Sequence, residues 1–173
     1  MKELLQKLNA CKDAIEWAGD KSWQEIYNTC HRGDWLLWLF KRTNPDDLKL
    51  LTLAKGHCAN TVRHLMKDER SIKAVDAAIA YGEGKISREE LDAAASAAYA
   101  AYVYDAAYAA YDAAGDGTYA AVGAAYAAAS AAADSAAYAN AAANAAAAKK
   151  ENQQLTADIC RKYLPIEVWN ITK

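Results

Sequence analysis

The sequence predicts an all-α fold, a helical bundle, and three observations support that prediction. Alanine fills 33 of the 56 positions from Ala93 to Ala148, and it is the strongest helix former. Elsewhere apolar residues recur at helical spacing, as at Leu4, Leu8 and Ile15. No segment shows the alternation of apolar and polar residues that marks a strand. With 173 residues, we expect one domain over 1–173, large enough for a hydrophobic core.

Turn and capping residues divide the first part of the chain, residues 1–86, into helices. Gly19 can end the first helix in left-handed geometry. Ser22 and Glu25 have the spacing of a capping box, in which each side chain satisfies a free backbone N–H of the other. We expect Gly33 to end the second helix and Asp34 to cap the third. The predicted helices are 2–18, 22–31, 35–41, 45–66 and 69–81.

The second part of the chain predicts a long helical hairpin over 87–150, followed by a C-terminal helix within 151–173. The sequence from Ser87 to Glu90 repeats the capping-box spacing and opens the first alanine helix. Gly115-Asp-Gly117 is a turn signal in the middle of the alanine tract. The expected helices are therefore 88–114, 118–150 and 153–163.

Tryptophan dominates the most distinctive short segment, Gly33-Asp-Trp-Leu-Leu-Trp-Leu-Phe40. Trp35 and Trp38 are three residues apart, so they share one face of a helix. Because the helix is apolar nearly all round, we expect it to be buried as the centre of an aromatic core. The alternative is that the two tryptophans form a cage for a ligand. Trp17, Trp23 and Tyr27 are expected to join the same cluster.

Charge is distributed unevenly along the chain. Residues 1–88 carry 15 Lys and Arg against 12 Asp and Glu, whereas residues 89–148 carry none against 7. One wall of the protein should therefore be acidic, which disfavours nucleic acid on the alanine helices. The tract is too polar for a membrane span, since buried Asp and Asn are costly in lipid. We expect neither nucleic acid nor membrane as a partner, and a cytoplasmic protein.

Two sets of residues are candidate binding sites, and each also has a structural explanation. Acidic and tyrosine side chains of the alanine tract could contact a basic protein partner, or the tyrosines could pack while the aspartates stay solvated. These residues are Asp92, Tyr104, Asp105, Tyr108, Tyr111 and Asp112. A second set could bind a small anion on one helix face, or be a solvated polar stripe. It comprises His57, Asn60, Arg63 and His64.

Catalytic and metal-binding motifs are missing from the sequence. There is no HExxH, CxxC or glycine-rich phosphate loop, so we expect no enzyme activity, no cofactor and no metal. The four cysteines are far apart, and we expect reduced, mostly buried thiols. They are Cys11, Cys30, Cys58 and Cys160.

Several of these segments resemble the Imm-5-like immunity protein family of bacteria and their phages. The similar segments are Ala14-Ile-Glu-Trp-Ala-Gly-Asp20, Cys30-His-Arg-Gly-Asp-Trp-Leu-Leu-Trp-Leu39, and Ala157-Asp-Ile with Arg161 and Pro165. The resemblance spans roughly residues 5–168, although the tract lacks the Lys and Arg that relatives often carry there. The family name implies a protein that binds and neutralises a toxin.

We therefore expect an immunity or anti-defence protein that binds a protein partner such as a toxin in a fixed stoichiometry. The acidic alanine hairpin is the first candidate surface, because tyrosine and acidic side chains can anchor a basic partner. The alternative is a phage or bacterial protein that sequesters a small molecule, such as a nucleotide signal, between its helices. The abundance of Trp and Tyr and the patch at His57, Arg63 and His64 support that alternative.

Overall fold

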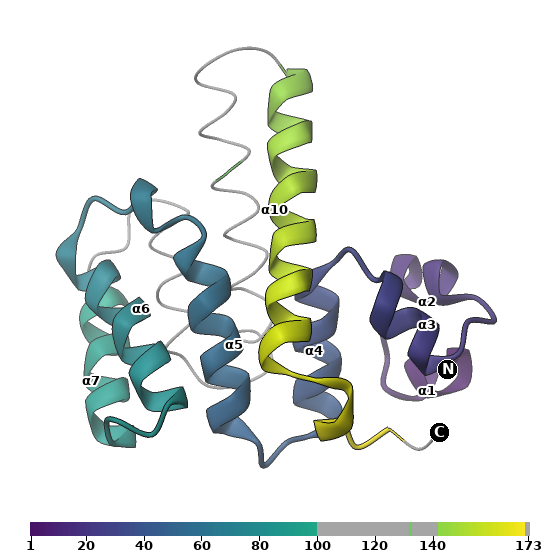
Figure 1. Cartoon of the computed structure of the whole chain (residues 1–173), viewed down its shortest axis with the longest axis horizontal. Coiled ribbons are helices and arrows are strands. Elements are labelled where there is room, and N and C mark those ends of the chain that lie inside the picture. Colours follow the sequence, from purple (N-terminus) through teal and green to yellow (C-terminus); the bar gives the residue numbers. More distant parts are fainter. Residues whose placement is uncertain (100–131, 133–141, 172–173) are drawn as a thin grey trace.

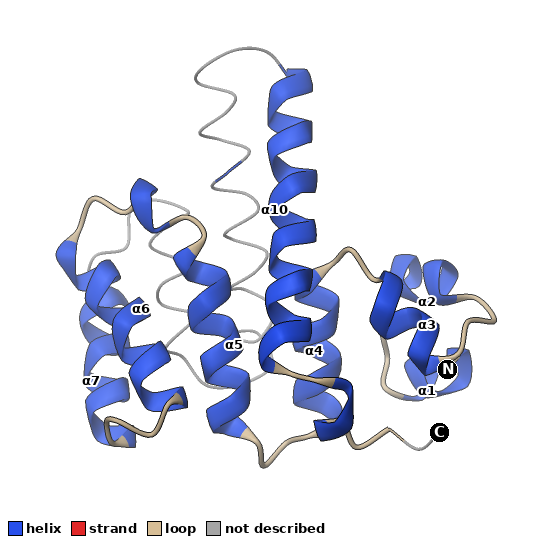
Figure 2. Cartoon of the chain, viewed as in Figure 1, coloured by secondary structure: helices blue, strands red, loops and turns tan. Residues whose placement is uncertain are grey.

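The all-α fold is confirmed. The computed structural model describes residues 1–99, 132 and 142–171, and in these residues it contains eight α-helices, two 3-10 helices and no strand (Figure 1, Figure 2). Most of the predicted hairpin, including the turn at 115–117, lies outside the described residues. Its two ends are seen, as part of α7 and of α10.

Three short helices form the N-terminal part of the fold, which lies on the right in Figure 1. The prediction of one helix over 2–18 is wrong, because the chain breaks at Asn9, which has a φ of 59°. The N–H of Ala10 donates to the carbonyl of Leu5, and the N–H of Asn9 donates to the carbonyl of Gln6. These bonds form a Schellman turn, in which asparagine tolerates the left-handed position. The helices are α1 (Lys2–Lys7), α2 (Lys12–Ala18) and α3 (Trp23–Thr29).

The predicted end of α2 and start of α3 are confirmed. Gly19 has a φ of 51° and follows the last residue of α2. Ser22 and Glu25 form the predicted capping box, with both reciprocal bonds present. These two signals set the short connection between α2 and α3.

Helix α4 (Gly33–Thr43) holds the tryptophan segment and begins two residues earlier than predicted. Asp34 does not cap it, because Asp34 lies inside the first turn and pairs with Arg32. Gly33 is needed for packing rather than to end a helix. A Cβ at Gly33 would lie 2.7 Å from the main-chain carbon of Thr156. Glycine therefore lets the start of α4 approach another helix closely.

Helix α5 (Leu48–Asn60) is shorter than predicted, because the chain leaves the helix at Thr61 and forms a 3-10 turn, η1 (Arg63–Leu65). The sequence Asn44-Pro-Asp-Asp47 has the form of a helix start, with Asn44 as the cap, but the residue that precedes α5 is Asp47. The Asn44 side chain donates to the carbonyl of Val168 at 2.6 Å and accepts from the N–H of Asn170 at 3.1 Å. It therefore fastens the C-terminal segment to the end of α4.

Helix α6 (Glu69–Gly82) packs beside α5, and α7 (Arg88–Tyr99) packs against α6. The capping box at Ser87 is confirmed, since its N–H donates to Glu90 at 2.8 Å and its Oγ accepts from the N–H of Glu90 at 3.2 Å. On α7 the buried residues recur at Leu91, Ala95 and Ala98, which is one helical face. The alanine tract thus begins as a packed helix.

The C-terminal part is one long helix, α10 (Ala142–Tyr163), followed by η2 (Ile166–Val168). The prediction of separate helices ending at 150 and starting at 153 is wrong, since α10 crosses both positions. Figure 1 shows α10 beside α4 and α5, where it occupies the middle of the molecule.

Side chains are buried in two hydrophobic clusters. One joins α1 to α5 with α10, and it contains the buried rings Trp23, Tyr27, Phe40 and Trp169. The other joins α5, α6 and α7 through smaller residues. Trp169 was not expected in the aromatic core, but its ring lies 4.8 Å from Trp23 and 5.0 Å from Phe40.

Candidate functional site

A small apolar pocket lies where α1, α2 and α3 meet α4. Its volume is about 130 Å³, and we call it the tryptophan pocket. Its walls come from all four helices and from the α1–α2 turn. The lining residues are Leu5, Ala10, Cys11, Ala14, Trp17, Ala18, Ile26, Cys30, Asp34, Trp35, Leu36, Trp38 and Leu39.

The break in the chain at Asn9 helps to build this pocket. After the Schellman turn, α2 runs back over α1, so Leu5 of α1 and Ala14 of α2 line the same cavity. Small residues at Ala10, Ala14 and Ala18 leave space between the helices that larger side chains would fill. The pocket therefore depends on a break that the helical periodicity of residues 2–18 does not reveal.

Three tryptophans line the pocket, and all three are only half-buried. Helix α4 is buried through Leu37, Leu39 and Phe40, as predicted, but Trp35 and Trp38 pack against the core rather than inside it. Trp17 and Trp35 lie 5.9 Å apart between ring centroids, with planes tilted by 58°. His31 lies 6.0 Å from Trp17 and 6.3 Å from Trp35. These rings form a second aromatic group, apart from the buried group around Trp169.

The rings expected in one cluster all lie in or against one hydrophobic cluster, but their ring-to-ring contacts fall into two groups. Leu37 and Phe40 face the core and are inaccessible, whereas Trp35 and Trp38 line the pocket together with Leu36 and Leu39. The spacing of three residues did place the two tryptophans on one face, as predicted. The ligand-cage alternative therefore gains support from the position of that face.

A cation lies over each tryptophan of the pocket. The Lys21 ammonium lies 4.6 Å from the Trp17 ring, and it also donates to the main-chain carbonyl of Trp17. The Arg32 guanidinium lies 4.6 Å from the Trp35 ring, and Arg42 lies 5.6 Å from Trp38. These are cation–π distances.

Asp34 is the one acidic residue in the pocket wall. It is 5% exposed and accepts two hydrogen bonds from Arg32, at 2.8 Å and 2.5 Å. This bidentate pair raises the pKa of Arg32 and keeps its charge in place at the start of α4. The carboxylate is thereby neutralised within the protein.

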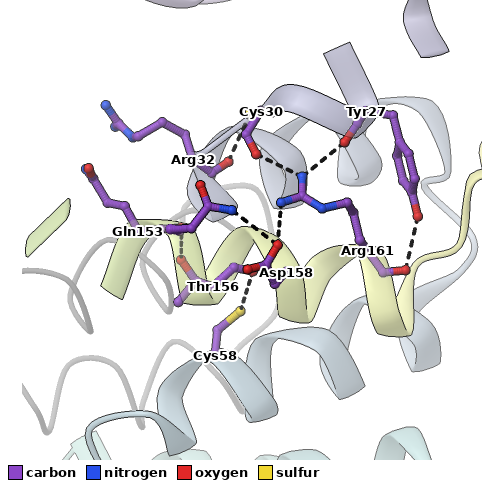
Figure 3. Close-up of polar contacts among 9 residues, drawn as sticks. Tyr27, Cys30, Arg32, Cys58, Gln153, Thr156, Asp158 and Arg161 are labelled. Atoms are coloured by element: carbon purple, nitrogen blue, oxygen red, sulfur yellow. Dashed lines mark hydrogen bonds and ion pairs between the residues drawn. The ribbon is translucent and has the colours of Figure 1, made fainter. Parts of the chain in front are cut away.

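An arginine on α10 holds the wall that α3 contributes to the pocket (Figure 3). Arg161 donates from Nη1 to the carbonyls of Tyr27 at 3.0 Å and Cys30 at 2.8 Å, and from Nη2 to Asp158 at 2.6 Å. In return the Tyr27 hydroxyl donates to the carbonyl of Arg161 at 3.0 Å. A charged donor at the C-terminal end of a helix is favourable for its free carbonyls.

The structure does not bring the predicted anion-binding patch together. Asn60 ends α5 and His64 lies on the following 3-10 turn, so the predicted shared helix face is interrupted. Arg63 pairs with Asp76 on α6 through two bonds, which raises the pKa of Arg63. His57 stacks on Tyr163 at 4.0 Å, and burial together with Lys162 lowers the pKa of His57.

Of the predicted acidic surface, only Asp92 lies within the described residues. It is exposed on α7 and pairs with Arg88 one turn earlier, at 2.8 Å. Tyr104, Asp105, Tyr108, Tyr111 and Asp112 lie outside the described residues.

Three of the four cysteines are buried, as expected, and Cys11 is exposed. Burial raises the pKa of the Cys30 thiol to about 11 and raises that of Cys160 as well, so both are held as unreactive thiols. Among the residues that the structure describes, no three His, Cys, Asp or Glu side chains are placed to hold a metal ion. Across the same residues, no helix has the length and apolar character to cross a bilayer.

A buried lysine was missed in the sequence. Lys55 on α5 is only 2% exposed, and it interacts with a further group of the protein. The available signal was its spacing, since Leu51, Ala54 and Cys58 share its helical face and are buried.

No family model, no curated protein and no solved structure matches the chain. The resemblance to the Imm-5-like family therefore stays a prediction from the motif residues. The structure gives three of those residues a role in packing, since Gly33 contacts Thr156 and Arg161 bonds to Cys30.

Proposed function

We propose that the protein binds a small ligand in fixed stoichiometry, without catalysis, and that the tryptophan pocket is the binding site. One observation carries the proposal: three half-buried tryptophans surround an apolar cavity of about 130 Å³. Apolar pockets with a few polar groups at the edge are the usual form of small-molecule sites. An apolar cavity of about 150 Å³ holds benzene, so this one suits a single aromatic ring.

This proposal retains the sequestration alternative and changes its site and its ligand size. The His57 patch is dispersed, so it offers no common anion site. A cavity of about 130 Å³ also encloses much less than a whole nucleotide. A small aromatic molecule, or one ring of a larger ligand, fits the space better.

The test is a titration with benzyl alcohol, a neutral single-ring probe, followed by tryptophan fluorescence. For a probe of this size we expect a dissociation constant of about 0.1–1 mM. At about ten times that concentration, binding should stabilise the native state by about 1.4 kcal/mol and raise the melting temperature by about 3–5 °C. No saturable change in fluorescence or melting temperature would refute the proposal.

A matched pair of variants places the binding in the pocket. Ala14 lines the pocket, so Ala14→Leu fills part of it and should abolish the response to benzyl alcohol. Ala97 is exposed on α7, so Ala97→Leu makes the same change away from the pocket and should leave binding unaltered. Equal binding by both variants would place the ligand elsewhere.

A second candidate function is the neutralisation of a protein partner such as a toxin, and charge segregation favours it. Residues 89–148 carry 7 acidic side chains and no Lys or Arg, and Asp92 is exposed at the start of this segment. A basic protein would be attracted to such a surface, with an effect on association rate that salt screens. For a partner isolated from the native host, the double substitution Asp105→Lys and Asp112→Lys should slow association at low salt. Unchanged kinetics would exclude this surface.

A further inference from the structure

We infer that the tryptophan pocket selects a small aromatic anion, with the ring between the tryptophans and the negative group at the cations around them. This inference rests on the proposed function, because it names the charge of the ligand for the same pocket. Three features support it: the cations over the pocket-lining rings, the paired state of the acid in the pocket wall, and the donors that remain on those cations.

The rings of the pocket already bind cations of the protein itself. A tryptophan ring attracts a cation through the negative charge above its face. Trp17, Trp35 and Trp38 are each occupied in this way, by Lys21, Arg32 and Arg42. The three rings are therefore a poor cage for a cationic ligand, since its charge would meet the like charges of the protein.

The pocket also lacks a carboxylate that could pair with a cationic ligand. Asp34 accepts from Nε and Nη2 of Arg32, so both of its oxygens are occupied. Glu16, which precedes Trp17, pairs with Lys12 at 3.6 Å. Asp13 and Asp20, the other acids near Trp17 in sequence, are exposed and do not line the pocket.

Hydrogen-bond donors remain for an anion. Arg32 bonds to Asp34 through Nε and Nη2, and no hydrogen bond within the described residues uses its Nη1. Arg42 is exposed and lies over the ring of Trp38, and it forms no ion pair with any other described residue. A guanidinium suits a carboxylate because its planar donors match the two oxygens.

The experiment compares three single-ring probes of different charge: phenylacetate, benzyl alcohol and benzylamine. Binding is followed by tryptophan fluorescence at constant ionic strength. We expect phenylacetate to bind about tenfold more tightly than benzyl alcohol, the effect of one charge-assisted hydrogen bond, and benzylamine to bind most weakly.

Two arginine variants locate the charge effect. Arg42→Gln should weaken the binding of phenylacetate several-fold, because one nearby positive charge is lost. It should leave the binding of benzyl alcohol unchanged. Arg70→Gln is the matched control, because Arg70 is an exposed arginine on α6 that pairs with Asp68, whereas Arg42 lies over the pocket-lining ring of Trp38. It should change neither probe.

The outcomes separate this inference from the proposed function. Equal affinity for the three probes, or tightest binding of benzylamine, overturns the preference for an anion while the pocket remains a ligand site. Binding of none of the three overturns both proposals. An equal loss of phenylacetate affinity in Arg42→Gln and Arg70→Gln would show that only the overall charge of the protein matters, and it overturns the role of Arg42.

Discussion

Replacing Arg161 with alanine tests how α10 holds the pocket-forming helices. The substitution removes two charged donors from the carbonyls of Tyr27 and Cys30, at 3.0 Å and 2.8 Å, and the ion pair with Asp158. Hydrogen bonds to a charged group contribute about 1.5–3 kcal/mol each. The side chain is 19% exposed, so water replaces part of what is lost. We expect the free energy of unfolding to fall by about 2–4 kcal/mol.

The assay is urea denaturation of the wild type and matched variants. Arg70→Ala also removes an arginine from an ion pair, but that pair is 48% and 36% exposed, so its cost should stay under about 1 kcal/mol. Arg161→Lys keeps the charge without the two-pronged geometry and should fall between the two. If Arg161→Ala lowers the free energy of unfolding no more than Arg70→Ala does, the stabilising role of the Arg161 hydrogen bonds is refuted.

Three further predictions follow from the packing and the titrating groups. Gly33→Ala should destabilise the fold by about 1–3 kcal/mol in the same assay, because its Cβ would lie 2.7 Å from the main chain of Thr156; a neutral result would contradict the close approach. In the native protein a thiol reagent should modify Cys11 first, and bound phenylacetate should slow that reaction, because Cys11 is exposed and lines the pocket. Rapid modification of Cys30 would contradict its burial. The lowered pKa of His57 makes the unfolded state take up its proton first, so stability should fall as the pH drops below about 6.5, and less so in His57→Gln. An identical pH dependence in that variant would exclude His57 as a cause.

Local signals in the sequence predicted much of the fold. The capping boxes at Ser22 and Ser87 and the turn at Gly19 all form as expected, because each depends only on neighbouring residues. The predicted helix boundaries were wrong where tertiary contacts determine them. Asn44 has the form of a cap, but its side chain bonds to the C-terminal segment more than a hundred residues away.

The candidate site was harder to predict than the fold. The spacing of Trp35 and Trp38 placed them on one face, but burial of that face depends on what α1 and α2 leave open. The turn at Asn9 was the missing information, since a periodic pattern continues through it without interruption. Asparagine at a helix end was the available signal, because it tolerates a positive φ.

Charged partners were equally hidden from the sequence. Asp34 and Arg63 were given local roles, as a cap and as part of an anion patch, but each is occupied by an ion pair in the fold. The partner of Arg63 is Asp76 on the next helix, which spacing alone does not reveal. Such pairings depend on how helices pack rather than on motifs.

The most direct test of the pocket is an NMR titration with phenylacetate that monitors the indole N–H signals of the five tryptophans. Trp17, Trp35 and Trp38 line the pocket, so their signals should shift together and saturate. Trp23 and Trp169 are buried in the other aromatic group, and Trp169 donates to the carbonyl of Leu164 at 2.9 Å. Their signals should stay in place. Saturable shifts at Trp23 and Trp169 alone, or at no tryptophan, would contradict a ligand site in the tryptophan pocket.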